Sequence, residues 1–161
     1  MYTHLLVPLD GSAAAEAALP HAQALAERFS ARVTLMRVTV APETVIAETA
    51  TGAPGVPEAG PLIDPTPVVE AEKAEASSYL QRLTDRLRSS GLREVNAEAP
   101  EGPAAETIVE RARALGVDLI VMSTHARGGL GRLVFGSTAD AVLRHTPCPV
   151  LLIRVEESAE S

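Results

Sequence analysis

Residues with the chemistry to hold a phosphate group are concentrated between Ser123 and Thr138. The range 128–131 contains three glycines, and a backbone without Cβ atoms lets its amide groups approach a ligand closely. Arg127 and Arg132 flank this range and could neutralise negative charge. The composition of the stretch therefore predicts a loop that binds an anion through backbone amides and arginine side chains.

The end of the same stretch has the pattern of a helix start. Gly136 permits the turn into the helix, and Ser137 followed three residues later by Asp140 is typical of a capping box. A helix start offers free amides and a positive dipole end to a phosphate, and the hydroxyls of Ser137 and Thr138 would add hydrogen bonds. A glycine-rich turn before a capped helix that binds nothing fits the same residues, so the local pattern leaves both interpretations open.

Other polar residues have more ambiguous positions. Asp10 follows the first predicted strand, where it could cap the first helix, contact a ligand, or do both. His125 follows the fourth predicted strand and is expected to orient the loop rather than to catalyse, because no partner nucleophile is evident. We predict no catalytic residue and no metal ligand. The remaining histidines and the single cysteine lack metal-ligand spacing and a disulfide partner; they are His4, His21, His145 and Cys148.

Strand and helix patterns alternate along the chain. Apolar runs predict strands at 5–9, 33–40, 93–99, 117–123 and 149–154, and helical spacing predicts helices at 12–29, 69–89, 102–115 and from 137 onward. This order indicates an α/β fold, a five-stranded parallel Rossmann-like open sheet with helices on both faces. Ligands of such sheets bind beyond the carboxyl ends of the strands, where the strand order reverses. The polar ends of the first and fourth strands therefore predict that these two strands are neighbours.

Composition limits the function classes. The chain has 161 residues, 46% of them hydrophobic, which suits a single domain over 1–155 with a polar tail at 156–161. Residues 41–67 hold six prolines and three glycines and are predicted to form a long loop. A net charge of −7 gives no overall attraction to nucleic acid or to an anionic membrane. We expect a cytoplasmic protein, since neither a signal peptide nor a membrane span is evident.

Several nucleotide and phosphate motifs are excluded by residue type. A P-loop needs a lysine beside its glycines, and the only lysine is Lys73, far from any glycine-rich loop. The first strand is followed by Asp10-Gly11-Ser12, which is neither the glycine fingerprint of dinucleotide-binding folds nor the loop of amidating synthetases. A phospho-aspartate receiver would need a lysine near the last strand, and none is present.

Three motifs in chain order resemble those of universal stress proteins. The resemblance rests on Leu6-Val7-Pro8-Leu9-Asp10-Gly11-Ser12, on the stretch from Met122 to Arg132 followed by Gly136-Ser137, and on Thr146-Pro147-Cys148-Pro149-Val150-Leu151-Leu152. It covers nearly the whole chain apart from 41–67 and the tail. The ATP-binding branch of that family has the pattern G-x2-G-x9-G-S/T, and this chain keeps the spacing with Ser123 and Ala126 at the first two glycine positions.

The resemblance implies an adenine-nucleotide site for ATP, or ADP or AMP, with Mg²⁺ on the phosphates. Pro8, Asp10 and the backbone of Val38 would contact the adenine and ribose, and Ser137 and Thr138 the phosphates. The full set of implied contact residues is Pro8, Asp10, Val38, Ser123, His125, Ala126, Arg127, Gly128, Gly136, Ser137 and Thr138.

Two other functions stay open. Ser123 and Ala126 favour a nucleotide-free stress regulator, which by resemblance would act as a homodimer joined through the last strand, Val150 to Arg154. A slow ATPase or a nucleotidyl-transfer enzyme is the second alternative. A pair of catalytic carboxylates would favour it, and the sequence offers none.

Overall fold

Five parallel strands form one sheet in the computed structural model, which describes residues 1–42, 64–125 and 136–155. The strand order is β3-β2-β1-β4-β5, so β1 and β4 are neighbours at the point where the order reverses, as predicted. The strands are β1 (His4–Pro8), β2 (Arg32–Met36), β3 (Val95–Glu98), β4 (Leu119–His125) and β5 (Val150–Val155).

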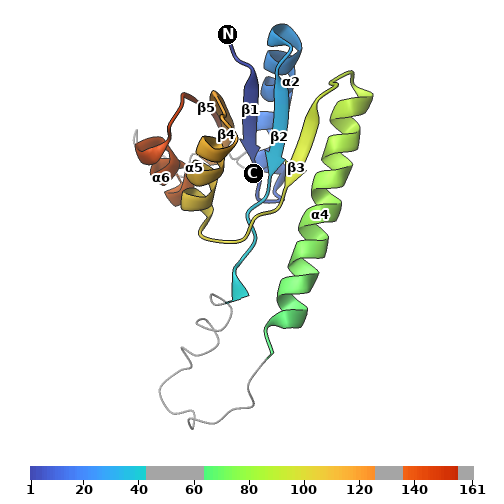
Figure 1. Cartoon of the computed structure of the whole chain (residues 1–161), viewed down its shortest axis with the longest axis vertical. Coiled ribbons are helices and arrows are strands. Elements are labelled where there is room, and N and C mark those ends of the chain that lie inside the picture. The colour runs from blue at the N-terminus through green and yellow to red at the C-terminus, as the bar shows by residue number, and fades with distance from the viewer. Residues whose placement is uncertain (43–63, 126–135, 156–161) are drawn as a thin grey trace, which may run out of the picture.

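Helices cover both faces of this sheet, which confirms the predicted fold class (Figure 1). One face carries α1 (Ala13–Glu16), α2 (Ala18–Phe29) and α4 (Thr66–Ser89), and the other carries α5 (Ala104–Ala114) and α6 (Ser137–His145). Figure 1 shows the first half of α4 extending past the carboxyl ends of the strands. That half of α4 therefore stands beside the edge where parallel sheets bind ligands.

Aliphatic side chains build the two layers of the core. Leu5 and Val7 of β1 point into the layer under α2 and α4, whereas Leu6 points into the layer under α5 and α6, and all three are fully buried. This alternation is the period of a strand buried on both faces. Small residues on α2, Ala18, Ala22 and Ala26, let the helix approach the sheet closely. Phe29, at the end of this helix, is 36% exposed and its ring meets that of Tyr2 edge to face.

Several boundaries differ from the sequence prediction, and the neighbouring segments explain them. β2 ends at Met36 rather than at 40, because its neighbour β1 ends there. The last backbone hydrogen bond between the two segments runs from the Leu9 amide to the Met36 carbonyl oxygen, 2.7 Å. β4 continues to His125 rather than stopping at 123, because its partner β5 pairs with it as far as Val155.

The helix starts were also displaced. α4 begins at Thr66, three residues before the predicted start, with Pro65 at its N-cap. α5 begins at Ala104, two residues after the predicted start, with Pro103 as its N-cap residue at φ −63° and ψ 129°. Most of the predicted loop at 41–67, namely 43–63, and the predicted tail lie outside the described residues. Among the helices that the structure describes, none is long and apolar enough to cross a membrane.

Candidate functional site

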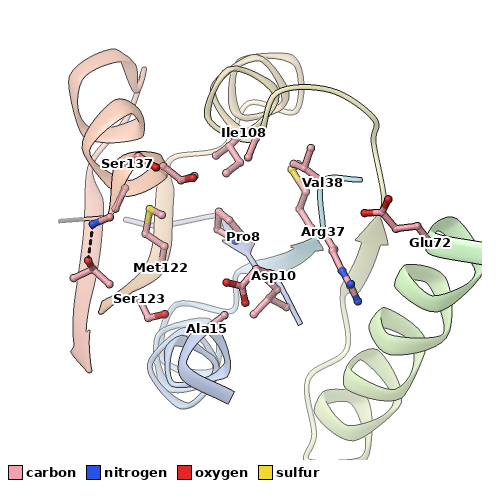
Figure 2. A pocket seen from close by; sticks show the side chains of 17 residues that line it. Pro8, Asp10, Ala15, Arg37, Val38, Glu72, Ile108, Met122, Ser123 and Ser137 are labelled. Carbon is pink, nitrogen blue, oxygen red and sulfur yellow. Dashed lines mark hydrogen bonds between the residues drawn. The ribbon is translucent and has the colours of Figure 1, made fainter. Parts of the chain in front are cut away.

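A cavity of about 610 Å³ opens at the carboxyl ends of β1, β2 and β4 (Figure 2). Pro8, Leu9 and Asp10 enter it from the end of β1, and Met36, Arg37 and Val38 from the end of β2. The opposite wall consists of Met122, Ser123 and Thr124 on β4 and of Gly136 to Ala139 at the start of α6. Ala15, Glu72, Ala104 and Ile108 complete the lining.

This location follows from the strand pairing. β1 pairs with β4 only at Leu5 and Leu6, opposite Leu119 and Ile120. β4 then continues for several residues against β5 alone, with Ser123 opposite Ile153 and Thr124 opposite Arg154. The edge of β4 that faces β1 is therefore not paired with a strand beyond Ile120 in the described part of the chain. Crevices of this kind are the ligand sites of open α/β sheets.

The turn after β1 holds Asp10 at the cavity. The Asp10 Oδ1 atom accepts a hydrogen bond from the Ser12 amide at 2.8 Å, and the Ser12 hydroxyl accepts one from the Ala15 amide at 3.1 Å. Gly11 between them has φ +89°, a conformation that side chains disfavour. Ser12 is thus the N-cap of α1, and Asp10 braces the turn while its carboxyl group lines the cavity.

The start of α6 lies across the cavity from this turn. Its N-cap is Gly136, Ser137 is the first helical residue, and no side chain caps it. The predicted capping box of Ser137 and Asp140 was therefore wrong, because Ser137 lies one position too late and Asp140 instead pairs with Arg144 at 2.8 Å. The hydrogen bond from Arg144 lowers the pKa of Asp140. The first amides of α6 consequently have no partner inside the helix.

Thr124 provides a polar contact between the end of β4 and the start of α6. Its side chain is buried, with 8% of the residue exposed, and its hydroxyl oxygen accepts a long hydrogen bond from the Gly136 amide at 3.4 Å. The dashed line at the edge of Figure 2 marks this contact. Thr124 was not among the predicted contact residues.

The backbone of Val38 offers a donor and an acceptor to the cavity. The amides of Arg37 and Thr39 donate toward β3, to the carbonyl oxygens of Glu98 and Pro100 at 3.1 and 2.8 Å. In extended chain successive residues face opposite sides, so the N–H and C=O of Val38 face the side on which β1 has already ended. Within the described residues neither group has a hydrogen-bond partner.

Arg37 places a cation at the rim of the same cavity. Its guanidinium lies 5.4 Å from the ring centroid of Tyr79 and 3.5 Å from the Glu75 carboxylate, and its side chain is only 14% exposed. A Cβ added to Gly11 would come within 3.2 Å of this guanidinium. Burial, followed by the negative charge of Glu16, raises the pKa of the Tyr79 hydroxyl to about 12. Sequence patterns gave no signal for Arg37 or Glu72, because each of them contacts residues more than 30 positions away in the chain.

The predicted contact residues divide into two groups. Seven of them line this one cavity: Pro8, Asp10, Val38, Ser123, Gly136, Ser137 and Thr138. His125 is the last residue of β4, and its side chain lies outside what the structure describes. Ala126, Arg127 and Gly128 also lie outside the described residues.

The remaining titratable candidates are remote from the cavity. His4 is buried at the opposite end of β1, His21 is exposed on α2, and His145 ends α6. Burial raises the pKa of the half-buried Cys148 thiol, which disfavours a reactive thiolate. In the described part of the chain, no three histidine, cysteine or acidic side chains gather in a way that could hold a metal ion.

Comparison with known proteins places the chain in a family. The model of the universal stress protein family matches residues 1–154. A universal stress protein of Methanocaldococcus jannaschii is 30% identical over 154 residues, which cover 96% of this chain and 83% of the relative. The chain therefore belongs to the universal stress protein family.

Solved structures agree with this assignment. The universal stress protein UspA from Lactobacillus plantarum superimposes with a TM-score of 0.73 at 28% identity, covering 95% of this chain and 98% of that one. One more distant structure is a universal stress protein in complex with cAMP, with a TM-score of 0.66, covering 95% of this chain and 97% of that one. Another, from Archaeoglobus fulgidus, is in complex with dAMP, with a TM-score of 0.61, covering 94% of this chain and 98% of that one. Both are 20% identical to this chain and support the fold.

Proposed function

We propose that this protein binds an adenine nucleotide, ATP in the first place, in the cavity between β1, β2 and β4, and uses it as a regulatory ligand in a stress response. The observation that carries the proposal is the pairing of two features across one cavity of about 610 Å³. A backbone donor and acceptor at Val38 lie at one end, and the uncapped start of α6 lies at the other. Relatives in complex with cAMP and dAMP support the choice of adenine.

The base end suits the Watson–Crick edge of adenine. Adenine presents an acceptor at N1 next to a donor at N6. The Val38 N–H can donate to N1 while the Val38 C=O accepts from N6. Polar groups that a bound base would shield from water need partners, so a base that satisfies both groups is favoured over one that leaves them unpaired.

The sugar lies between the two ends in this proposal. The carboxyl group of Asp10, held by the Ser12 amide, is an acceptor for ribose hydroxyls. The turn is rigid because Gly11 and the Ser12 cap determine its course. An acceptor fixed in position binds at a lower entropic cost than one on a mobile chain.

The phosphates would meet the start of α6. The amides of Ser137 and Thr138 have no partner within the helix, and their hydroxyls add hydrogen-bond donors. The positive end of the helix dipole favours the negative charge. Hydroxyl and phosphate oxygens are ligands that Mg²⁺ accepts, so the ion would enter with the phosphates and be held mainly by them.

A charge substitution at Ser137 tests this proposal. Aspartate at the first turn suits the helix dipole, so Ser137→Asp should keep the fold, but its carboxylate would repel the phosphates. Isothermal titration calorimetry should show ATP binding to the wild-type protein, at least about tenfold weaker ATP binding to the variant, and unchanged adenosine binding. His125→Ala is the comparison variant and should lose less affinity. The absence of ATP binding to the wild-type protein at millimolar nucleotide would overturn the proposal.

A homodimer joined through β5 is the second part of the proposal. β5 is the outermost strand on its side of the sheet, and all its residues except Arg154 are half-buried apolar side chains. An outer strand with unpaired backbone groups is a template for pairing with another chain. Dimerisation of this kind is compatible with nucleotide binding and is also the basis of the nucleotide-free alternative. We expect any ATP hydrolysis to be slow.

A further inference from the structure

Glu72 approaches the proposed base site from a helix that packs elsewhere along most of its length. It lies in the first half of α4, lines the cavity, and its Oε1 atom accepts a hydrogen bond from the Val40 amide at 3.4 Å. Figure 2 shows its carboxyl group pointing toward the side of the cavity formed by Arg37 and Val38. The proposed contacts to the base, the ribose and the phosphates do not involve this carboxylate.

The order of groups along the chain after β2 gives Glu72 a defined place. Since Arg37 and Thr39 face β3, Val38 and Val40 face the cavity side. Along that side the chain presents first the Val38 N–H, then the Val38 C=O, and then the Val40 N–H, which Glu72 occupies. A donor is therefore followed by two acceptors, one from the backbone and one from the Glu72 carboxylate.

We propose that Glu72 is a specificity-determining residue that recognises the exocyclic amino group at position 6 of the purine. The inference rests on the proposed function. With N1 on the Val38 amide, one N6 proton reaches the Val38 carbonyl and the other reaches the Glu72 carboxylate. A 6-oxo purine, such as hypoxanthine or guanine, would turn its O6 lone pairs toward both acceptors and its N1 proton toward the Val38 N–H. A bound base would take these half-buried acceptors out of water, and acceptors left unpaired or repelled in that way discriminate strongly between such bases.

Neighbouring acidic residues of α4 do not share this position. Glu75 pairs with Arg37 at 3.5 Å and its side chain is 71% exposed, and Glu70 is exposed to solvent. Neither of them lines the cavity. Glu70 therefore offers a matched control, since it has the same charge on the same helix without access to the base.

ATP and ITP form the appropriate pair of probes, because they differ only along one edge of the base: ITP has an oxygen in place of the amino group at position 6 and a proton on N1. Their dissociation constants should be measured by calorimetry for the wild-type protein and for Glu72→Ala, Glu72→Gln and Glu70→Gln. We expect the wild-type protein to prefer ATP by at least about tenfold, the size of a hydrogen bond to a charged group. Glu72→Ala should lose about tenfold in ATP affinity and little in ITP affinity. Glu72→Gln should gain ITP affinity, because its amide can donate to O6, and Glu70→Gln should retain the wild-type preference.

The ratio of the two affinities separates this inference from damage to the fold and from the proposed function. A partly unfolded variant would lose ATP and ITP affinity alike, so its ratio would stay at the wild-type value. Val38 alone also disfavours ITP, so a wild-type preference for ATP that is undiminished in both Glu72 variants would overturn the inference and leave nucleotide binding intact. Failure of the wild-type protein to bind either nucleotide would overturn the proposed function, and this inference with it.

Discussion

The hydroxyl of Thr124 lies 3.4 Å from the amide of Gly136 and joins the end of β4 to the start of α6. On the other side of the cavity, Gly11 lets the guanidinium of Arg37 pack against the turn after β1. Each contact depends on one residue type: a buried hydroxyl in the first case and a missing Cβ in the second. Substitutions at these two residues therefore test the two sides of the cavity separately.

Thr124→Val removes the hydroxyl while keeping the shape of the side chain. The Gly136 amide would lose its partner, and the start of α6 would be held less firmly opposite β4. We expect ATP affinity to fall about fivefold, the equivalent of one ordinary hydrogen bond, while adenosine affinity stays unchanged. Calorimetry with both ligands measures this, and Thr124→Ser should restore ATP binding. An equal loss for adenosine and ATP would contradict a role at the phosphate end.

Gly11→Ala combines two costs. The residue has φ +89°, and the added Cβ would lie 3.2 Å from the Arg37 guanidinium. Gly116, with φ +63° and no atom within 4 Å of an added Cβ, isolates the backbone cost alone. Urea unfolding should show a loss of about 1–2 kcal/mol for Gly116→Ala and a larger loss for Gly11→Ala. Equal losses would mean that Arg37 moves aside freely.

At the scale of elements, β1 is anchored at the end opposite the cavity. His4 is 3% exposed, with Nδ1 at 3.1 Å from the Leu115 carbonyl oxygen and Nε2 at 2.8 Å from the Thr34 hydroxyl. A carbonyl oxygen only accepts, so Nδ1 carries the proton and Nε2 accepts from Thr34. Asp118 accepts hydrogen bonds from the Thr3 and His4 amides, at 2.8 and 3.2 Å. This network joins β1, β2 and the start of β4.

The stability of the protein should decrease in mild acid because of His4. Burial, and next the positive charge of Arg32, lowers the pKa of His4 below the ordinary 6.5. As the pH falls below 6.5, the imidazole of His4 binds a proton more readily in the unfolded chain than in the folded chain. The contribution of His4 to the free energy of unfolding therefore decreases as the pH falls below 6.5 and is constant above that pH. Urea unfolding between pH 7.5 and 5 measures the slope. His4→Gln should flatten it and exposed His21→Gln should not; the same slope in all three proteins would contradict the assignment.

At the scale of the whole molecule, β5 is an outer strand through which the sheet could pair with a second copy of the chain. The Ile120 amide donates to the Pro149 carbonyl oxygen at 3.0 Å, and the pairing continues from Ile120 opposite Val150 to His125 opposite Val155. The backbone groups of Leu151 and Ile153 therefore face β4, and those of Leu152 and Arg154 face outward. The outward groups would pair with a second copy in the proposed dimer.

Arg154→Pro should separate such a dimer. Proline removes the outward amide of Arg154 without touching a hydrogen bond to β4, and the Arg154 side chain is exposed. Light scattering after size-exclusion chromatography should give a dimeric mass for the wild-type protein and for Arg154→Ala, and a monomeric mass for Arg154→Pro. A dimer that persists in the proline variant would place the interface elsewhere, and a wild-type monomer would remove this part of the proposal.

Much of the architecture was predictable because it depends on local patterns. The apolar runs at Leu5–Leu9 and Leu119–Met122 fit strands that are buried on both faces, and alternation with helices requires a parallel sheet. The family resemblance also implied a set of contact residues, and seven of them line one cavity. Ser123 could be assigned to the ligand-binding edge from sequence because it directly follows the apolar run Leu119–Met122.

Tertiary structure alone decided three features of the site. Thr124 rather than a capping box lies near the first amides of α6, because β4 runs further than its apolar pattern does. The N–H and C=O of Val38 have no partner among the described strands because β1 ends at Pro8, opposite Met36, two residues before Val38. Arg37 and Glu72 meet at the cavity only after α4 packs beside β2 and β3. The sequence by itself determined the elements and the family motifs, since these depend on nearby residues; the specificity of the cavity depends on where separate elements end, which only their packing establishes.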